Sequence, residues 1–336
     1  MPAVRQAKIY ATKRTALEDV IPLKVPFSVQ IDVCSACNIA CAFCVHSDAD
    51  AVKRAGIKWG FMSLQLFRKI IDDMKNSWAG EKVKKLRLFQ MGEPLLNPAI
   101  VDMVKYAKDA QVADYIEITT NATLLTPKLS MELITAGLDF LIVSVNGITE
   151  EQYRTVCNYQ MDFVTFRDNL RYFYDNKKQC QVWLKYGDIG YSKEQKDQFY
   201  ELFEDCCDQI FVETISATLW QDTNVADKIV DAHKGTYGQK LEKKRVCPFI
   251  FTTLIINDQG IAHLCCADWK CKHILGDLKK VSVADIWGGE KLREYQIKHL
   301  SMCKDDIDIC VNCESLSANT TDDIDEYSKK ILERMQ

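Results

Sequence analysis

Residues 33–47, VCSACNIACAFCVHS, carry four cysteines within eleven residues, with no histidine or carboxylate between them. Cys37, Cys41 and Cys44 form a Cys-x3-Cys-x2-Cys pattern, and Cys34 lies three residues before it. The chain has 15 cysteines and no recognisable export signal. In a reducing compartment, clustered thiols more often bind metal or catalyse reactions than form disulfides. The stretch therefore predicts a metal or redox centre on one short loop.

Zinc is one alternative, because Cys34 can complete a four-thiolate set of the kind found in structural zinc sites. Such sites usually draw two pairs of ligands from separate turns, whereas these four cysteines share one loop. Three thiolates on one loop suit one face of an iron–sulfur cube, whose fourth iron stays open to a small molecule. We interpret Cys34 as a small apolar residue near the end of the first strand.

The composition is that of an ordinary globular protein, with 336 residues, 47% of them hydrophobic and 27% charged. The net charge of -4 and the absence of long basic runs argue against nucleic-acid binding. No window approaches eighteen consecutive apolar residues, and the N-terminus lacks an apolar signal segment. The sequence predicts a cytoplasmic protein with no membrane or nucleic-acid partner.

Six apolar, β-branched runs alternate with helix-like segments between residues 25 and 217. The runs are VPFSVQIDV, KKLRLFQMG, DYIEITTNA, DFLIVSVNG, CQVWLKYGD and QIFVETISA. This alternation predicts parallel βα units in an α/β fold. Six units rather than eight predict a partial (β/α)6 TIM-like barrel, whose functional residues gather at the carboxyl ends of the strands. The cysteine loop directly follows the first strand.

The pattern of Cys37, Cys41 and Cys44, with Phe43 before the last cysteine, resembles the signature of the radical S-adenosylmethionine (radical SAM) enzymes. The resemblance implies a [4Fe-4S] cluster on these three cysteines, with SAM bound to the open iron and Phe43 beside it. It implies reductive cleavage of SAM to a 5′-deoxyadenosyl radical, which abstracts a substrate hydrogen atom. The electron donor that it implies is a flavodoxin or ferredoxin-type protein.

The second predicted strand ends in FQMGEPLLNP. Gly92 lets the backbone approach a ligand, Glu93 can accept hydrogen bonds from an ammonium group, and Pro94 fixes the turn. A plain turn with a solvated glutamate is the alternative. Met91, Gly92, Glu93 and Pro94 resemble the family's Gly-Gly-Glu-Pro element, with Met in place of the first Gly. The resemblance implies that this turn receives the amino group of SAM.

The third and fourth strands end in TTNATLL and SVNGIT. Short polar side chains at strand ends can hydrogen-bond a ribose or a carboxylate, or can simply cap turns. We predict the capping role for Thr120 and a cofactor contact for Asn121. Ser144 and Asn146 resemble the family's Ser-x-Asp-Gly strand end, with Asn replacing Asp, which implies that they contact SAM and that Ser144 binds its ribose.

Candidates for contact with the substrate are few. Lys185 and Tyr186 end the fifth strand and Glu213 lies in the sixth, although about half of such side chains face outward because they alternate along a strand. Cys157 and Cys303 are candidate thiol hydrogen-atom donors, which an epimerase would need. Most spare cysteines, however, are merely buried apolar residues.

A second group of cysteines lies beyond the polar, linker-like stretch HKGTYGQKLEKKR. Cys247 and Cys265 bracket a predicted hairpin, and Cys310-x2-Cys313 closes the segment. Four such thiolates suit a closed metal site, and their spacing does not distinguish zinc from iron.

The interval from Cys247 to Gly260 and Cys265 resembles the start of a SPASM domain. No cysteine follows Cys313, so the segment resembles the shortened twitch form. This resemblance implies a second, auxiliary [4Fe-4S] cluster held by the four cysteines. The alternative ligands are Cys266, Cys271 and Cys303.

The predicted organisation has four parts. They are an N-terminal extension (1–24), a radical SAM partial barrel (25–232), a twitch/SPASM-type domain (245–318) and a C-terminal helix (319–336).

Three functional classes compete. The order of the second group of cysteines is similar to that of an aminocyclitol dehydrogenase of the radical SAM family, which favours oxidation of a sugar, cyclitol or amino sugar. In that reading the auxiliary cluster accepts an electron, and an epimerase of a similar small molecule is the runner-up. A peptide-modifying enzyme is less favoured, because only 33 residues precede Cys34. The barrel pattern argues against a non-enzymatic zinc or electron-transfer module.

Overall fold

The computed structural model describes residues 3–7, 14–215, 220–225 and 234–336. The end of the predicted barrel domain at residue 232 lies outside these residues. The six predicted strands are all present and parallel, and they are neighbours in chain order. They are β2 (Ser28–Ile31), β3 (Val83–Arg87), β4 (Ala113–Thr120), β5 (Phe140–Val145), β6 (Gln181–Asp188) and β7 (Gln209–Thr214). The predicted α/β fold with a partial (β/α)6 barrel is therefore confirmed.

The sheet extends beyond these six strands at both edges, in the order β1-β7-β6-β5-β4-β3-β2-β8-β9-β10. β1 (Val4–Arg5) pairs with β7 in parallel. At the other edge, β8 (Thr253–Ile256) is parallel to β2, followed by antiparallel β9 (Ile261–His263) and β10 (Ile274–Asp277). The predicted hairpin of the second domain thus continues the barrel sheet, and the end of β2 lies between β3 and β8.

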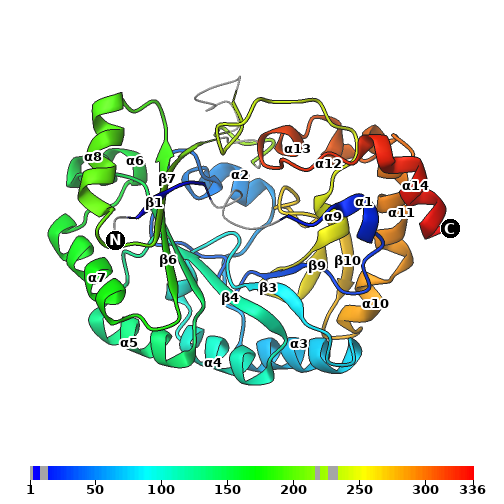
Figure 1. Ribbon diagram of the computed structural model, residues 1–336, viewed down its shortest axis with the longest axis horizontal. Coiled ribbons are helices and arrows are strands. Elements are labelled where there is room, and N and C mark those ends of the chain that lie inside the picture. The colour runs from blue at the N-terminus through cyan, green and yellow to red at the C-terminus, as the bar shows by residue number, and fades with distance from the viewer. Residues whose placement is uncertain (1–2, 8–13, 216–219, 226–233) are drawn as a thin grey trace.

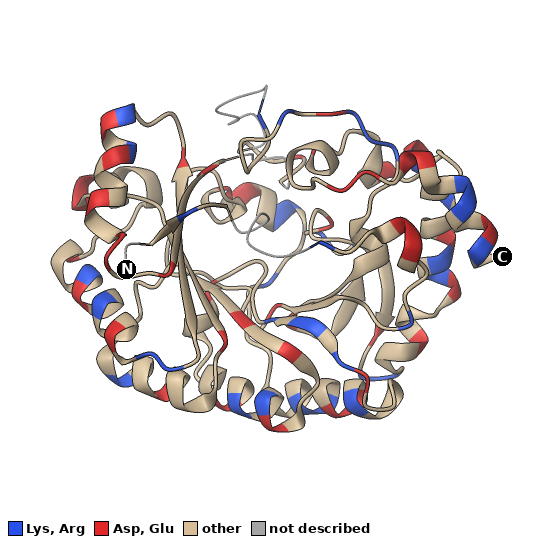
Figure 2. Ribbon diagram, viewed as in Figure 1, with Lys and Arg blue, Asp and Glu red and all other residues tan. Residues whose placement is uncertain are grey.

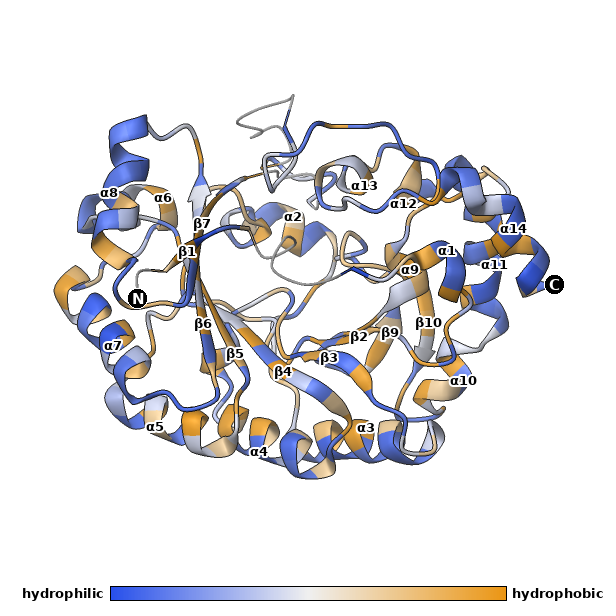
Figure 3. Cartoon of the chain, in the orientation of Figure 1, coloured by the Kyte–Doolittle hydropathy of each residue, from blue (hydrophilic) through white to orange (hydrophobic). Residues whose placement is uncertain are grey.

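Helices form an outer arc around the strands, while α2 (Ala49–Arg54) lies inside the arc (Figure 1). The arc consists of α3 (Leu64–Ser77), α4 (Ile100–Ala110), α5 (Pro127–Ala136), α6 (Glu150–Cys157), α7 (Phe163–Asn176) and α8 (Lys193–Phe203). Their outer faces carry the charged residues, and apolar residues dominate the strands (Figures 2 and 3). The amphipathic sequence of each helix therefore determines its orientation, because its apolar stripe packs against the sheet.

Helix α3 illustrates how local sequence sets these elements. Its buried residues Phe67, Ile70, Ile71 and Met74 recur at helical spacing. The hydroxyl of Ser63 accepts a hydrogen bond from the Leu66 amide and so caps the first turn. The helix therefore begins where a capping residue precedes an apolar stripe.

The C-terminal part is built from short helices around the β8–β10 edge (Figure 1). They are α9 (Phe249–Thr252), α10 (Val283–Trp287), α11 (Glu290–Leu300), α12 (Asp308–Val311), α13 (Ser315–Ala318) and α14 (Ser328–Met335), and α1 (Leu17–Val20) precedes the barrel. Within the predicted C-terminal helix, 319–336, the α-helix covers only its last part. Among the described residues, no helix is both long and apolar enough to cross a membrane.

The loop after β2 is fixed by backbone contact with the turn after β3. The Glu93 amide donates to the Ala36 carbonyl at 2.8 Å. A Cβ atom at Gly92 would lie 2.1 Å from the Ala36 oxygen and 2.6 Å from the Cys34 oxygen. Gly92 therefore permits close approach between two loops of the protein, and a side chain at position 92 would force these loops apart.

Asn97 adds a second tie to the same loop. Its amide nitrogen donates to the carbonyls of Val33 at 2.7 Å and Met62 at 3.0 Å. Its side-chain oxygen accepts from the Ala99 amide at the start of α4. One buried carboxamide thus joins β2, the segment before α3 and the start of α4.

This packing makes the fold sensitive to a single methyl group. Gly92→Ala is expected to lower the free energy of unfolding by about 1–3 kcal/mol, because neither backbone can yield without strain. Gly288→Ala is the matched control, since its added Cβ would lie 3.3 Å from the nearest atom and its φ is -87°. Urea denaturation measures both, and equal stability for the two variants would contradict the proposed contact.

Candidate active site

A cavity of about 650 Å³ lies at the carboxyl ends of the parallel strands. Cys37, Cys41 and Cys44 line one part of it. Residues from the C-terminal segment line another part, among them Cys247, Cys265, Cys266 and Cys313, and the ends of the barrel strands line the remainder. The two groups of cysteines that the sequence separates by two hundred residues therefore face a common space, whose size is typical of small-molecule sites.

In the first group, Cys41 is buried and Cys37 and Cys44 are partly buried. Burial raises the pKa of Cys37 to about 11 and that of Cys44 to about 12. The contact with Cys157, followed by burial, raises the pKa of Cys41 well above its ordinary value. Thiolates in such surroundings need a positively charged group to offset their charge. Three thiols with that need, on one loop, have the donor chemistry that an iron–sulfur cluster requires.

The second group is similar in character. The pKa of Cys265 is raised well above its ordinary value, mainly by burial. The neighbouring thiols of Cys266, Cys247, Cys313 and Cys310 raise it further. These five sulfurs therefore lie close enough to influence one another. Across the described residues, however, no three His, Cys, Asp or Glu side chains are close enough to hold a single metal ion. These cysteines therefore lie around a common space and not around the position of a single metal ion.

His299 connects two predicted ligands of this second group. It is 1% exposed, and its Nδ1 accepts from the Cys247 amide at 3.2 Å. Since Nδ1 accepts, Nε2 carries the proton in the neutral ring and donates to Cys310 Sγ at 3.6 Å. Burial lowers the pKa of His299 to about 4, which keeps the ring neutral. No pattern in the sequence predicts these contacts of His299.

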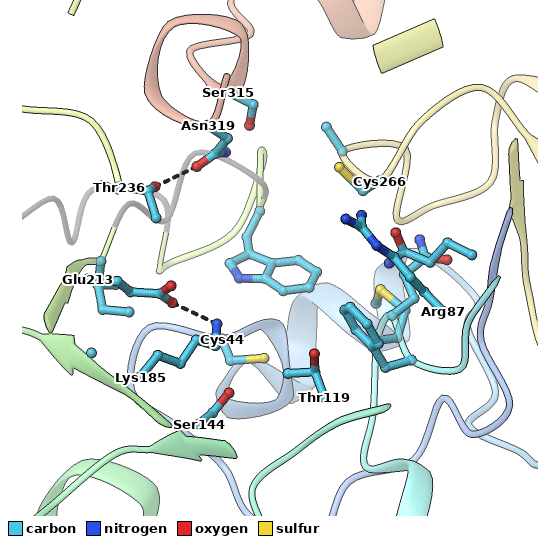
Figure 4. Close-up of a pocket in the computed structure, with 18 of the residues that line it drawn as sticks. Cys44, Arg87, Thr119, Ser144, Lys185, Glu213, Thr236, Cys266, Ser315 and Asn319 are labelled. Atoms are coloured by element: carbon cyan, nitrogen blue, oxygen red, sulfur yellow. Dashed lines mark hydrogen bonds and ion pairs between the residues drawn. The ribbon is translucent and has the colours of Figure 1, made fainter. Parts of the chain in front are cut away.

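The alternative ligands are placed differently from one another. Cys266 lines the cavity and lies beside Arg87 (Figure 4). Cys271 lines a separate, smaller cavity, where its sulfur accepts from Asn257. Cys303 is exposed, lines neither cavity and donates to the Ser301 carbonyl.

Glu93 is 2% exposed and lines the cavity. Its carboxylate accepts from the Thr120 hydroxyl at 2.6 Å, from the Asn121 amide at 2.7 Å and from the Leu95 amide at 2.9 Å. A carboxylate offers about four acceptor positions, so room for one further donor remains. Burial raises the pKa of Glu93 to about 7, and a bound ammonium group would lower it again.

The other predicted cofactor contacts lie at neighbouring strand ends. Met91 and Gly92 line the cavity, as do Phe43 and Ser144, whereas Pro94 is buried and begins the short 3-10 turn Pro94–Leu96. Asn121 Nδ2 donates to Asn38 at 3.0 Å and lies 3.9 Å from Cys37 Sγ. As predicted, Thr120 caps a turn by accepting from the Ala122 amide.

Asn146 behaves unlike a simple cofactor contact. It lines the cavity, but its Nδ2 donates to Cys41 Sγ at 3.4 Å. The family resemblance implied a contact with SAM for this position, which stays a prediction. The contact that the structure contains is with a cysteine of the first group.

Lys185 and Tyr186 point to opposite sides of β6, as strand alternation requires. Lys185 lines the cavity and forms an ion pair with Glu213, with 2.7 Å between Nζ and Oε1 (Figure 4). Tyr186 is fully buried and stacks between Tyr191 and Phe199. Of the two predicted substrate contacts from β6, only Lys185 therefore reaches the cavity.

Cys157, the remaining candidate, is 0% exposed and is not among the residues that line the cavity. It is the last residue of α6, and its Sγ lies 3.7 Å from Cys41 Sγ. Neither predicted hydrogen-atom donor, Cys157 or Cys303, therefore faces the space where a substrate would bind.

Two polar residues at the cysteine loop were not predicted from the sequence. His46 lines the cavity, and its Nε2 lies 3.0 Å from the Met91 carbonyl oxygen. Asp32 is 1% exposed, and its Oδ1 accepts from the Met91 amide at 3.3 Å, while its Oδ2 has no hydrogen-bond partner. The available signal for Asp32 was a charged residue inside the apolar run VPFSVQIDV.

Comparison with protein families gives two matches. The model described as the radical SAM superfamily matches residues 31–206, just over half of the 336-residue chain. The SPASM model, described as an iron–sulfur cluster-binding domain, matches residues 247–314.

Curated relatives match over part of their length. A GTP 3′,8-cyclase of Chlorobaculum tepidum is 34% identical over 128 residues, which are 38% of this chain and 35% of that protein. A tungsten-containing aldehyde ferredoxin oxidoreductase cofactor-modifying protein of Pyrococcus furiosus is 26% identical over 159 residues, 42% of this chain and 41% of that protein. This chain thus spans well under two thirds of the length of either relative.

Solved structures of similar fold cover most of the chain. BtrN in complex with AdoMet and 2-DOIA has a TM-score of 0.57 at 17% identity, over 90% of this chain and 98% of that one. Streptococcus suis SuiB bound to precursor peptide SuiA has a TM-score of 0.63 at 13% identity, over 83% and 68%. The protein anSMEcpe with bound AdoMet has a TM-score of 0.57 at 14% identity, over 93% and 96%. At these identities, the likeness is one of fold.

Asp32 generates a test of pH dependence. Burial, followed by the charge of Asp258, raises the pKa of Asp32 from 3.8 to about 7. Between these two values the folded chain binds more protons at Asp32 than the unfolded chain does, so the contribution of Asp32 to stability is greatest below pH 3.8 and is lost as the pH rises through 7. Asp32→Asn keeps the acceptor for Met91 and removes the titration.

The free energy of unfolding of Asp32→Asn, measured relative to that of the parent, is therefore expected to increase as the pH rises. The gain is at most about 1.4 kcal/mol per pH unit between pH 4 and 7. Asp114→Asn, at an exposed position, is the control. Parallel stability curves for parent and Asp32→Asn across this range would contradict the assignment.

Proposed function

Because this chain belongs to the radical SAM superfamily, we propose that it cleaves SAM reductively and uses the resulting 5′-deoxyadenosyl radical to oxidise a carbinol or amino carbon of a sugar, cyclitol or amino sugar. The family resemblance drawn from the cysteine loop is confirmed, and the two matched domains imply SAM and [4Fe-4S] clusters as cofactors. The observation that supports oxidation is the common cavity, because all three cysteines of the first group line it and so do Cys247, Cys265 and Cys313 of the second, although Cys310 does not.

We assign the SAM-binding cluster to Cys37, Cys41 and Cys44, and the auxiliary cluster to Cys247, Cys265, Cys310 and Cys313. When bound, these clusters supply the one-electron chemistry, giving one electron to SAM and taking one from the oxidised substrate. The remaining tasks fall to this chain's own side chains. They must bind a polar substrate, accept its proton and keep the reacting carbon near the SAM site.

The lining of the cavity suits a substrate with several hydroxyl or amino groups. Short polar side chains form part of this lining, and Thr119, Ser144, Thr236, Ser315 and Asn319 are labelled in Figure 4. Thr236 donates to Asn319 at 2.6 Å, which joins the wall after β7 to α13. Hydroxyl and amide groups can both donate and accept, so they match the mixed hydrogen-bonding needs of a cyclitol or amino sugar.

The Lys185–Glu213 ion pair is the candidate for proton transfer. Loss of a hydrogen atom from a C–OH carbon leaves a radical that must also lose its hydroxyl proton and one electron to become a carbonyl. The Glu213 carboxylate accepts that proton, and the Lys185 ammonium group donates a hydrogen bond to the substrate oxygen. The oxidation would then balance, because bound SAM would supply the radical that takes up the hydrogen atom and a bound auxiliary cluster would supply the acceptor for the electron.

An epimerase of a similar substrate is the runner-up. It would return a hydrogen atom from a thiol, but Cys157 and Cys303 do not line the cavity, so Cys266 is the lining thiol that it would need. A peptide-modifying enzyme is the third option, and the small-molecule dimensions of the cavity argue against it. The similarity of the second cysteine group to 2-deoxy-scyllo-inosamine dehydrogenase supports oxidation. We further propose a flavodoxin or ferredoxin-type donor and a cytoplasmic location.

The ligand assignment can be tested by counting iron. After anaerobic reconstitution, the parent is expected to hold about eight irons and a Cys37→Ala/Cys41→Ala/Cys44→Ala variant about four, because each cluster has its own ligands. The variant is expected to form no 5′-deoxyadenosine from SAM with dithionite. Cys34→Ala is the control and is expected to retain both clusters and SAM cleavage. Formation of 5′-deoxyadenosine by the triple variant would refute the assignment, and tightly bound zinc in place of iron would refute the function.

The reaction in D2O separates oxidation from epimerisation, with 2-deoxy-scyllo-inosamine as the first of a panel of aminocyclitols and amino sugars. An oxidation is expected to give a carbonyl product in step with 5′-deoxyadenosine, with no deuterium at the reacting carbon. A thiol donor exchanges its proton with solvent, so an epimerase would place deuterium on that carbon. Mass spectrometry of the product makes the distinction, and deuterium incorporation would overturn the proposed oxidation.

A further inference from the structure

We propose that Asn146 and Cys157 are positioning residues that raise the reduction potential of the SAM-binding cluster by donating two hydrogen bonds to the sulfur of Cys41. This inference rests on the proposed function, because it assumes that Cys41 is a cluster ligand. It gives Cys157 a role that does not require contact with the substrate, in place of the hydrogen-atom transfer predicted from the sequence.

Two side chains from different elements converge on one sulfur. Asn146 follows the end of β5, and its Nδ2 lies 3.4 Å from Cys41 Sγ. Cys157 ends α6, and its Sγ lies 3.7 Å from the same sulfur. Both distances are within the range of hydrogen bonds to sulfur. By comparison, Asn121 Nδ2 lies 3.9 Å from Cys37 Sγ. Cys41 thus has more side-chain donors than Cys37, and they lie closer to its sulfur.

Backbone hydrogen bonds hold the cysteine loop against the end of α6. The Ala40 amide donates to the Cys157 carbonyl at 2.8 Å, and the Ala42 amide donates to the Val156 carbonyl at 2.7 Å. These two bonds flank Cys41 in the sequence. They hold the backbone of the cysteine loop against that of α6 without relying on either cysteine side chain, so replacing the Cys157 thiol leaves the attachment of the loop in place.

The backbone around Asn146 is also held. The Asn146 amide donates to the Tyr153 hydroxyl at 3.4 Å, and its carbonyl accepts from the Tyr191 hydroxyl at 3.3 Å. Tyr153 is fully buried and packs in the same small apolar group as Cys41 and Cys157. Asn146 and Cys157 are both buried, and a hydrogen bond to a charged sulfur is stronger in such surroundings than in water.

Ligation decides the direction of the two bonds. A cluster-bound Cys41 is a thiolate, which can only accept, so the Cys157 S–H group and the Asn146 amide group must donate. Reduction adds one negative charge to the cluster, and donors to its sulfurs stabilise the more negative state. Their combined effect is to make an electron easier to deliver to the cluster.

A redox titration followed by electron paramagnetic resonance tests this in the reconstituted holoenzyme. The cluster of interest is identified as the one whose signal changes when SAM is added. At the midpoint potential of the parent, Cys157→Ala is expected to lower the ratio of reduced to oxidised cluster about threefold, and Cys157→Ala/Asn146→Ala about tenfold, or ~59 mV for a one-electron couple. The cause is the loss of one and then both donors.

Matched variants separate hydrogen bonding from packing. Cys157→Ser keeps a donor and is expected to stay closer to the parent than Cys157→Ala. Cys180→Ala removes another fully buried thiol, whose sulfur donates to the Gln181 carbonyl, and is expected to leave the potential unchanged. Should Cys157→Ala not assemble its cluster, Asn146→Ala alone removes the second donor and is expected to lower the same ratio.

The outcomes are distinguishable. Potentials of Cys157→Ala and Asn146→Ala equal to that of the parent would overturn the inference while leaving the proposed function intact. Failure of both variants to bind four irons at this site would also overturn it, because the two residues would then be needed to hold the cluster. Absence of SAM cleavage by the parent, in contrast, would refute the proposed function itself.

Discussion

The backbone contact between the cysteine loop and the turn after β3 is the constraint on which the rest of the site depends. It exists because position 92 has no side chain and because the Glu93 amide bonds the Ala36 carbonyl. The Glu93 carboxylate carries the connection to the end of β4 through Thr120 and the Asn121 amide. Three consecutive strand ends are thereby locked together, and the thiols after β2 gain fixed positions at the top of the barrel.

The second consequence of the fold is that one sheet serves both groups of cysteines. β8 pairs in parallel with β2, so the strand that leads into the first cysteine loop is also the neighbour of the segment between Cys247 and Cys265. If the second group lay in a separate domain on a flexible linker, the distance between the two groups would not be fixed. Here the hydrogen-bonded register sets it, and members of both groups line the same cavity, which suits the proposed transfer of an electron from a bound substrate.

Local pattern and long-range geometry were not equally predictable from the sequence. The six strands follow from runs of β-branched residues and their order, and the loop at residues 37–44 follows from cysteine spacing, because both are local signals. Partners separated by many residues leave no such signal. The contacts of Cys157 with Cys41 and of His299 with Cys310 depend on tertiary packing, and so does the orientation of Tyr186. That Lys185 or Tyr186 would face the cavity was predictable, since strand alternation requires one of two neighbouring residues to face inward.

The departure from the family pattern at position 146 now has a physical reading. The family's Ser-x-Asp-Gly strand end has a carboxylate there, which can only accept hydrogen bonds when ionised. In this chain the side chain reaches the sulfur of Cys41, and a carboxylate so close to a buried thiolate would be repelled and would disfavour added negative charge. Asparagine keeps nearly the same shape and offers an N–H donor instead. The substitution is therefore matched to the presence of Cys157 on the same sulfur, because both residues favour a more negative Cys41.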